Sequence, residues 1–280
     1  MNNKLAIISV IYQNYLVLGD FFTSLRHQNN KNFHVFISDN SPKKHEVNTQ
    51  SVPSTIIPSA NLGYAHGINL GIKEAIRQGY NLFCTINNDI YFKENLIGSV
   101  LKSSKKYPNS IITGKIYYAK GYEYHKDRYK KEDLGKILWY AGGYVDWDHA
   151  LNKHRGVDQL DEGQYNHPEE TDFISGCLMV FNKHVVEKIG FLDEKYFLYF
   201  EDADYDERAK RNGIKLLYDP SIVIWHKVSQ STGGSGSFLQ RKYQEKNRVI
   251  FGLKYAPFRT KVHLVRNYAF AFVKNLFTSR

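Results

Sequence analysis

Apolar runs alternate with amphipathic stretches along the first third of the chain, and this pattern predicts alternating strands and helices. The runs rich in β-branched and apolar residues are typical of buried strands, and the stretches with apolar residues at helical spacing are typical of helices packed on them. The predicted strands cover 5–12, 33–38, 55–57 and 82–86, and the predicted helices cover 16–28 and 65–78. Strands that alternate with helices indicate an α/β fold with a doubly wound, Rossmann-like and mostly parallel sheet.

The second half is less regular and predicts a mixed arrangement. Residues 118–170 are rich in Tyr, His, Gly and charged side chains and predict no definite elements. Regular patterns return after them. They predict a strand-like stretch at 172–181, a helix at 183–189, a helix at 202–211 ended by Gly213, and a strand at 215–225. The Gly- and Ser-rich segment 229–237 is typical of a flexible loop.

Composition indicates a folded globular protein without a membrane span. Of the 280 residues, 42% are hydrophobic and 24% are charged, which excludes a disordered chain. No apolar run of about 18 residues occurs, so we expect no transmembrane helix, and the first apolar run is expected to be a strand and not a signal peptide. Cys84 and Cys177 lie in apolar segments, which predicts buried free thiols in a reducing cytoplasm.

The positive charge is concentrated at the C-terminal end. The formal net charge is +10, and residues 238–280 alone contain ten basic residues and one acidic residue, a net charge of +9. We therefore expect a nearly neutral domain at 1–237, with halves 1–117 and 118–237, and a basic helical tail at 238–280. A basic module that binds nucleic acid is a competing interpretation. A hallmark RNA-binding motif is absent, however, and the basic residues are interleaved with long apolar stretches.

Polar residues follow the predicted parallel strands, and in such sheets ligands bind beyond the carboxyl ends of the strands. Gln13-Asn14, Asp39-Asn40-Ser41 and Asn87-Asn88-Asp89 stand at these ends. The Gly-containing segment 61–71 precedes and begins a helix, where it suits a diphosphate or, equally, a tight turn. A nucleotide-binding oxidoreductase would place a Gly-x-Gly-x-x-Gly turn after the first strand, and here that strand ends in Ile-Tyr-Gln-Asn.

Two further features suggest a metal site and a general base. Asn87-Asn88-Asp89 taken alone is typical of a strand-terminating turn and His226 taken alone of a structural histidine, but together Asp89 and His226 would offer a divalent cation one carboxylate and one imidazole. Five acidic residues crowd into positions 201–207, directly after the apolar run 196–200. A helix start explains part of this cluster. A carboxylate beside like charges and an apolar wall gains proton affinity, which suits a base.

The order of these motifs resembles the family 2 glycosyltransferases of the GT-A fold, in the branch of bacterial rhamnosyltransferases and galactofuranosyltransferases. The resemblance runs from Leu5 to about Lys254. It rests on the segments VIYQN, SDNS, NLGYAHGINLGI, INNDI, YAGGYVD, TDFISGCLMV, FLDEKYFLYFEDADYDERAKRNG and IWHKVSQSTGG. Asn87 replaces the first acid of the family's Asp-x-Asp metal motif, so Asp89 is left as the main carboxylate ligand.

The resemblance implies roles for individual residues. Asp39 would hold the nucleobase, Asp202 would be the catalytic base with Glu201 beside it, and Asp89 and His226 would bind Mg²⁺ or Mn²⁺. Asp206 and Glu207 are expected to be the solvated start of the helix. The implied donor-binding residues are Tyr12, Asn14, Asp39, Asn40, Asn61, Gly63, Asn69 and Asn88, and the implied acceptor-binding residues are Asp172, Gly176 and Asp204.

The resemblance also implies an activity. We expect an inverting, metal-dependent hexosyltransferase of polysaccharide biosynthesis (O-antigen or capsule) that uses dTDP-L-rhamnose, or alternatively UDP-galactofuranose or another UDP-sugar. The acceptor would be a bacterial surface glycan, lipid-linked at the cytoplasmic face of the membrane, with no nucleic acid as partner. The segment 262–277 of the tail mixes aromatic and basic residues. It predicts either a peripheral membrane helix or a helix packed on the domain.

Overall fold

The first half of the chain forms the parallel part of a sheet. In the computed structural model, which describes residues 4–228 and 238–267, this part contains β1 (Leu5–Ile11), β2 (Phe33–Asp39), β3 (Ser54–Pro58) and β4 (Leu82–Ile86). β1 pairs in parallel with β2 and β4, and β2 pairs in parallel with β3. The connections include α1 (Leu18–Arg26) and α2 (Tyr64–Arg77). The predicted elements of this half are therefore confirmed to within a few residues at their ends.

The second half adds a mixed set of strands to the same sheet. The path runs β10-β12-β6-β11-β4-β1-β2-β3 across the described residues, with β5 paired to β12 and β7 paired to β6. β11 runs antiparallel to β4 and β6, whereas β12 runs parallel to β6. The strands are β5 (Ile90–Tyr91), β6 (Ile111–Tyr118), β7 (Leu138–Tyr140), β10 (Glu169–Glu170), β11 (Leu178–Asn182) and β12 (Leu216–His226). The predicted α/β fold with a mixed C-terminal half is confirmed.

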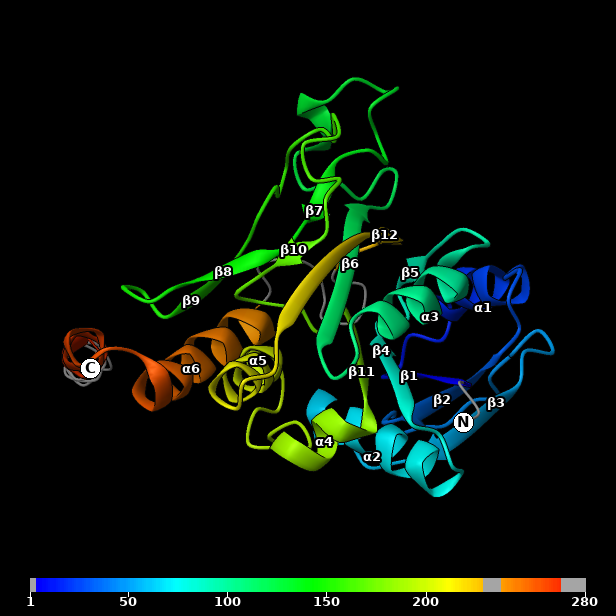
Figure 1. Cartoon of the computed structure of the whole chain (residues 1–280), viewed down its shortest axis with the longest axis horizontal. Coiled ribbons are helices and arrows are strands. Elements are labelled where there is room, and N and C mark those ends of the chain that lie inside the picture. The colour runs from blue at the N-terminus through cyan, green and yellow to red at the C-terminus, as the bar shows by residue number, and fades with distance from the viewer. Residues whose placement is uncertain (1–3, 229–237, 268–280) are drawn as a thin grey trace, which may run out of the picture.

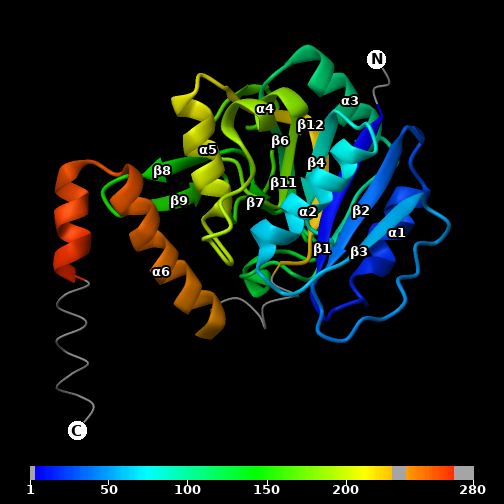
Figure 2. The same ribbon diagram turned by 90° about the horizontal axis from the view of Figure 1, so that it is seen from below.

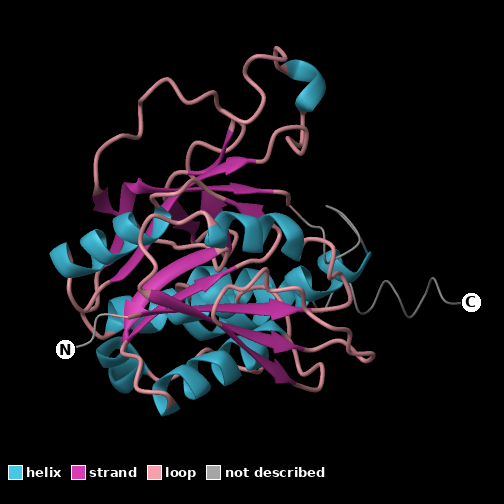
Figure 3. Cartoon of the chain, turned by 90° about the vertical axis from the view of Figure 1, so that its right-hand side faces the viewer, coloured by secondary structure: helices cyan, strands magenta, loops and turns pink. Residues whose placement is uncertain are grey.

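Helices cover both faces of the sheet, as Figures 1 and 3 show. One apolar cluster joins α1 and α3 to the sheet, and a second joins α2, α4 and α5 to it. The further helices are α3 (Leu96–Lys106), α4 (Lys183–Ile189), α5 (Glu201–Arg211) and α6 (Phe238–Tyr255). Packing on both faces explains why β1, β2 and β4 read as nearly continuous apolar runs.

The strand-like stretch predicted at 172–181 is shorter in the structure. Only its end forms β11, and residues 172–177 have no regular strand structure. Side chains of α5 replace strand partners for backbone N–H groups there. Asp206 accepts a hydrogen bond from the N–H of Ile174, and Asp202 accepts one from the N–H of Gly176. The apolar pattern reflects burial of Phe173 and Ile174, not strand pairing.

Part of the irregular middle region lies beyond the end of the sheet at the top of Figure 1, whereas other parts of it pair with the sheet or form a separate hairpin. It includes η1 (Lys126–Arg128), the short strand β7, and a separate hairpin of β8 (Gly143–Asp146) and β9 (Leu151–His154). A buried ion pair between Lys115 of β6 and Asp161 ties this region to the sheet.

The C-terminal segment begins with α6, which lies beside α5 in Figures 1 and 2. A further helical segment follows at 258–267. The predicted loop 229–237 and most of the predicted membrane segment, residues 268–277, lie outside the described residues. None of the helices in the described parts of the chain is long and apolar enough to cross a membrane. Cys84 and Cys177 are buried free thiols, as predicted.

Candidate active site

The carboxyl ends of β1, β2 and β4 meet at one edge of the sheet, beside the start of α2. Ile11 of β1 stands opposite Asp39 of β2. The side-chain amide of Asn40 donates to the carbonyl of Gly63, 3.1 Å away, and that of Asn88 donates to the carbonyl of Val10 at 2.8 Å. These bonds hold the three strand ends and the helix start together. Parallel strands bind ligands at this kind of edge.

The predicted donor-binding side chains differ in how accessible they are at this edge. Asp39 is buried; its Oδ2 accepts a 2.6 Å hydrogen bond from the Tyr15 hydroxyl, and its Oδ1 accepts one from the N–H of Ser41 at 3.0 Å. These bonds fix the orientation of the carboxylate. Tyr12 and Asn61 are exposed, and Asn14 is half-buried. The structure therefore brings a fixed carboxylate and accessible polar side chains to the same edge.

Asp89 and His226 face each other, although they are 137 positions apart in the sequence. β5 and β12 pair antiparallel with His226 opposite Ile90, which brings the strand end of β12 to the residue after Asp89. Oδ1 of Asp89 lies 3.1 Å from Nε2 of His226, and both side chains are buried. Burial lowers the pKa of His226, but the nearby Cys177 and Asp89 outweigh it and raise that pKa well above its usual value.

Tyr64, the first residue of α2, joins the metal-site candidates to the acidic cluster. Its hydroxyl donates to Oδ1 of Asn87 at 3.2 Å or to the carbonyl of Gly176 at 3.1 Å. Burial raises the pKa of Tyr64 well above its usual value, and the negative charges of Glu201, Asp202 and Asp89 add to the effect. Gly176, whose carbonyl accepts from Tyr64, also donates its N–H to Asp202, so Tyr64 and Gly176 connect Asn87 to the start of α5.

Glu201 and Asp202 begin α5 with their carboxylates at this site. Asp202 is half-buried; its Oδ2 accepts a 2.9 Å hydrogen bond from the N–H of Gly176, and its Oδ1 accepts one from the N–H of Ala203 at 2.8 Å. Burial raises the pKa of Asp202 despite these bonds. The pKa of Glu201 rises further, because it is more deeply buried and lies beside the charge of Asp202. A carboxylate of raised pKa suits a general base.

The turn before Glu201 has an uncommon backbone conformation. Tyr199 and Phe200 have φ angles of 67° and 72°, in the left-handed region. Each such non-glycine residue costs about 1 kcal/mol or more and persists only where surrounding contacts enforce it. On the opposite side, the carbonyl of Phe197 accepts a hydrogen bond from the N–H of Tyr64 at 2.9 Å. Gly63 allows this approach, because a Cβ there would lie 2.4 Å from that carbonyl oxygen.

Three predicted site residues lie elsewhere or are engaged in other contacts. Asn69 is buried inside α2, where its side chain bonds to the backbone of Leu192 and to Glu194. Asp204 is fully buried, and its carboxylate is bonded by Arg208, Lys254 and Tyr255. Asp172 is exposed, and its carbonyl accepts from Lys210 in the last turn of α5, whereas Gly176 contacts the first turn. The structure thus separates Asp172 from the candidate base.

The expectation of a solvated helix start at Asp206 and Glu207 is wrong, because both side chains are buried. Asp206 accepts a 2.6 Å hydrogen bond from the N–H of Ile174. Glu207 forms an ion pair with Lys210. Asp206 therefore bonds to a neighbouring segment and Glu207 pairs with bases of its own helix, which the sequence spacing of the cluster could not reveal.

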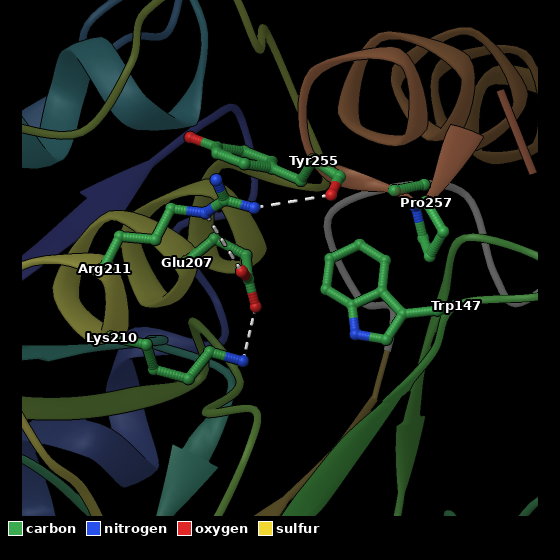
Figure 4. Close-up of a pocket in the computed structure, with 7 residues that line it drawn as sticks. Trp147, Glu207, Lys210, Arg211, Tyr255 and Pro257 are labelled. Carbon is green, nitrogen blue, oxygen red and sulfur yellow. Dashed lines mark hydrogen bonds and ion pairs between the residues drawn. The ribbon is translucent and has the colours of Figure 1, made fainter.

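Two hollows occur away from this edge. One has a volume of about 520 Å³ and lies between α5, α6 and Trp147 (Figure 4). Arg211 there bonds to the carbonyl of Tyr255 and pairs with Glu207, as the dashed lines of Figure 4 show. The other, of about 550 Å³, is lined by residues that include Tyr144, Arg155 and Asp172. Among the described residues, neither hollow contains a side chain of the Asp89, His226 and Asp202 cluster.

Sequence reasoning missed two residues that shape the site. Tyr64 lies within the predicted nucleotide segment, and its position at the helix start was the available signal. Asn247 of α6 is buried and donates to the carbonyls of Leu198 and Tyr199 at 2.8 and 2.9 Å. In the sequence it lies between Lys246 and Arg248, and no local pattern distinguishes it from the other polar residues of this basic segment.

Comparison with known proteins agrees with this geometry. A family model described as glycosyl transferase family 2 matches residues 6–190. An N-acetylglucosaminyl-diphospho-decaprenol L-rhamnosyltransferase of Mycobacterium tuberculosis is 22% identical over 250 residues, which cover 83% of this chain and 79% of that protein. The galactofuranosyltransferase GlfT2 of the same species is 23% identical over 147 residues, 51% of this chain and 23% of that protein.

Solved structures show the same fold. GalNAc-T7 with UDP, GalNAc and Mn²⁺ has a TM-score of 0.65 at 14% identity and covers 88% of this chain, which spans about half (48%) of that chain. The mannosyltransferase PcManGT of Pyrobaculum calidifontis, in complex with GDP-Man and Mn²⁺, has a TM-score of 0.52 at 15% identity over 93% of this chain and 68% of that chain. The family match, the GT-A fold and the clustered carboxylates lead to one conclusion: the chain belongs to glycosyl transferase family 2.

Proposed function

We propose that this family 2 glycosyltransferase transfers a sugar from a nucleotide-diphosphate donor with inversion, using Asp202 as base and a divalent cation held by Asp89 and His226. The observation that carries the proposal is the convergence of these side chains at the carboxyl edge of the sheet. Its support is a chain of contacts: Asp202 accepts from the N–H of Gly176, the Tyr64 hydroxyl bonds to the Gly176 carbonyl or to Asn87, and Asp89, two residues after Asn87, faces His226.

The Asp89 and His226 pair fits a divalent cation. Two ligands at neighbouring corners of an octahedron, each about 2.1 Å from Mg²⁺, are about 3 Å apart, and the two side chains are 3.1 Å apart. Among residues 4–228 and 238–267, no group of three acidic, His or Cys side chains could hold a metal alone. The donor's phosphates would complete the coordination, as is usual for Mg²⁺ with phosphate substrates. The cation would neutralise the charge of the leaving diphosphate.

Asp202 would take the proton from the acceptor hydroxyl as that oxygen attacks the sugar. A single base on the face opposite the leaving group gives in-line displacement, and hence inversion. Its hydrogen bonds with Gly176 and Ala203 hold the carboxylate in one orientation, and burial keeps its proton affinity high. Glu201, whose Oε2 is buried without a hydrogen-bond partner among the described residues, would tune or orient the base.

The donor favoured by the relatives is dTDP-L-rhamnose, because a related protein is an L-rhamnosyltransferase. UDP-galactofuranose or another UDP-sugar is the alternative, supported by the relation to a galactofuranosyltransferase. Asp39, held by Tyr15 and Ser41, would bind the nucleobase. The acceptor would be a lipid-linked glycan of a bacterial surface polysaccharide, in line with the diphospho-decaprenol in the name of the first relative.

We further propose that the C-terminal helices bring the enzyme to an anionic membrane at its cytoplasmic face. Large apolar side chains are exposed there, with Phe238 78% and Phe258 81% accessible, beside exposed bases such as Arg241 and Lys242. Aromatic side chains enter a membrane interface, and each base near it adds about 1 kcal/mol. Flotation with liposomes that contain phosphatidylglycerol should succeed at low salt. If the protein does not float, or if Phe238→Ser with Phe258→Ser floats equally, this role is excluded.

A thermal-shift screen tests the function directly. Ligands that bind only the folded state raise the melting temperature according to their concentration relative to Kd. UDP, dTDP and GDP would each be added with Mn²⁺ or with EDTA, and inorganic pyrophosphate and a short RNA would serve as controls. We expect dTDP or UDP to stabilise the protein in Mn²⁺ and to lose most of that effect in EDTA. If none of the nucleotides stabilises the protein, or if RNA does so instead, the proposal fails.

A further inference from the structure

The turn that leads into Glu201 and Asp202 is held by α6, in contacts that the chemistry above does not use. Asn247 of α6 is only 1% exposed. Its Nδ2 donates to the carbonyl of Leu198 at 2.8 Å and to that of Tyr199 at 2.9 Å. These carbonyls belong to the turn in which Tyr199 and Phe200 have positive φ angles. One buried amide therefore binds the backbone of the turn at two successive residues.

The side-chain type at position 247 matches this task. An asparagine amide nitrogen carries two hydrogens and can donate to two carbonyls at once, whereas an aspartate carboxylate can donate to neither. A left-handed conformation at two bulky residues persists only where the surroundings enforce it. The two hydrogen bonds from Asn247 help to hold the turn in this conformation. The turn leads directly into α5, because the carbonyl of Phe200 accepts the first hydrogen bond of that helix, from the N–H of Asp204.

Residues of two helices, α6 and α2, contact the segment that contains this turn. From α6, Tyr243 stacks on Phe197 with ring centroids 5.0 Å apart, and Phe251 contacts Phe200 at 5.5 Å. From α2, the N–H of Tyr64 bonds to the carbonyl of Phe197. The segment before the candidate base is therefore clamped between the helix that begins at the donor edge and the C-terminal helix.

We propose that Asn247 is a positioning residue for sugar transfer: it fixes the turn 198–200 and thereby aims the carboxylate of Asp202 at the acceptor hydroxyl. The inference rests on the proposed function and adds to it a role for α6. The basic C-terminal helix then belongs to the catalytic unit and is not an appendage that can be removed without loss of turnover.

The experiment compares Asn247→Asp and Asn247→Gln with two controls. Gln244→Ala changes an exposed side chain on the same helix, and Leu264→Ala truncates a buried side chain that lies close to Gly252 of α6. For each full-length protein we would measure the melting temperature, the Kd for dTDP and UDP with Mn²⁺ by calorimetry, and kcat and KM for release of the nucleotide diphosphate from the donor that the wild type uses.

A misdirected base should lower turnover and leave donor binding intact. We expect Asn247→Asp to reduce kcat by about 10- to 100-fold, since a displacement of about 1 Å has effects of that order. Its nucleotide Kd should stay within about twofold, the pattern of a loss confined to the transition state. Asn247→Gln, which keeps the amide donor, should recover part of kcat. Gln244→Ala should match the wild type.

Several outcomes would overturn the inference. One is a folded Asn247→Asp variant with wild-type kcat, and another is an Asn247→Gln variant that recovers no kcat relative to a folded Asn247→Asp. Another is a Leu264→Ala protein whose melting temperature and kcat fall as far as those of Asn247→Asp. The loss of kcat would then be explained by lowered stability alone. If Asn247→Asp does not fold, Asn247→Ala, which also removes the donor but adds no charge, decides by the same measurement: a folded variant with wild-type kcat overturns the inference. If the wild-type protein binds neither dTDP nor UDP, the proposed function itself is wrong. That result can be distinguished from a failure of the inference about Asn247.

Discussion

Replacing Asp202 with Asn removes the proposed base and changes the shape of the side chain little. The amide cannot accept a proton from an attacking hydroxyl, whereas the wild-type carboxylate can. General-base catalysis contributes about 10²- to 10⁴-fold to turnover, and each factor of ten corresponds to about 1.4 kcal/mol of activation free energy. We therefore expect kcat to fall by at least about 10²-fold, a loss of about 2.7 kcal/mol or more of transition-state stabilisation.

The same substitution should leave the folded protein nearly as stable as before. An Asn has one acceptor oxygen, so it keeps one of the two hydrogen bonds that Asp202 accepts from Gly176 and Ala203. Loss of one such bond costs about 1 kcal/mol. Burial raises the pKa of Asp202 in the folded state, so the stability tied to its proton is present at low pH and lost as pH rises through that pKa. The uncharged Asn avoids that loss at pH 7.

The assay combines turnover, nucleotide binding and melting at pH 7. We expect a large loss of kcat, an unchanged Kd for the nucleotide diphosphate with Mn²⁺, and a melting temperature within about 4 °C of the wild type. The wild-type pH profile of kcat/KM should fall on the acidic side at a pH above the usual Asp range of about 3.9, because burial raises the pKa. Near-normal turnover in Asp202→Asn, or loss of nucleotide diphosphate binding, would refute the role of Asp202 as a base.

Other positions give further predictions. Gly63→Ala should lower both stability, by about 2–4 kcal/mol in a denaturant titration, and turnover, because its Cβ would lie 2.4 Å from the Phe197 carbonyl; Gly98→Ala, with open space around it, is the control. Asp204→Asn should cost about 1–3 kcal/mol of stability, because the buried carboxylate loses its charged bonds with Arg208 and Lys254, whose own side chains are partly exposed; unchanged melting would contradict this. Asp89→Ala should weaken dTDP or UDP binding in Mn²⁺ but not in EDTA by calorimetry, and full activity in EDTA would exclude the metal.

The sequence by itself determined the α/β arrangement and the identity of most candidate groups. Strands such as β4 are buried on both faces, so their apolar runs and the helical spacing in α2 reported their environments directly. The polar residues at the strand ends, such as Asp39 and Asp89, followed from the rule that parallel strands bind ligands at their carboxyl edge. These signals are local or repeat along the chain, which is why they can be read without coordinates.

Tertiary structure alone decided which members of the acidic cluster face the site. Asp202 meets Gly176 at the candidate site, whereas Asp204 turns to Arg208 and Lys254, and Asp206 meets Ile174. Sequence gives all of them the same charge, and a helix carries neighbouring residues around its axis to different partners. Burial and pairing depend on what packs against each face. The role of α6 was hidden for the same reason, because its contacts join residues about 50 positions apart.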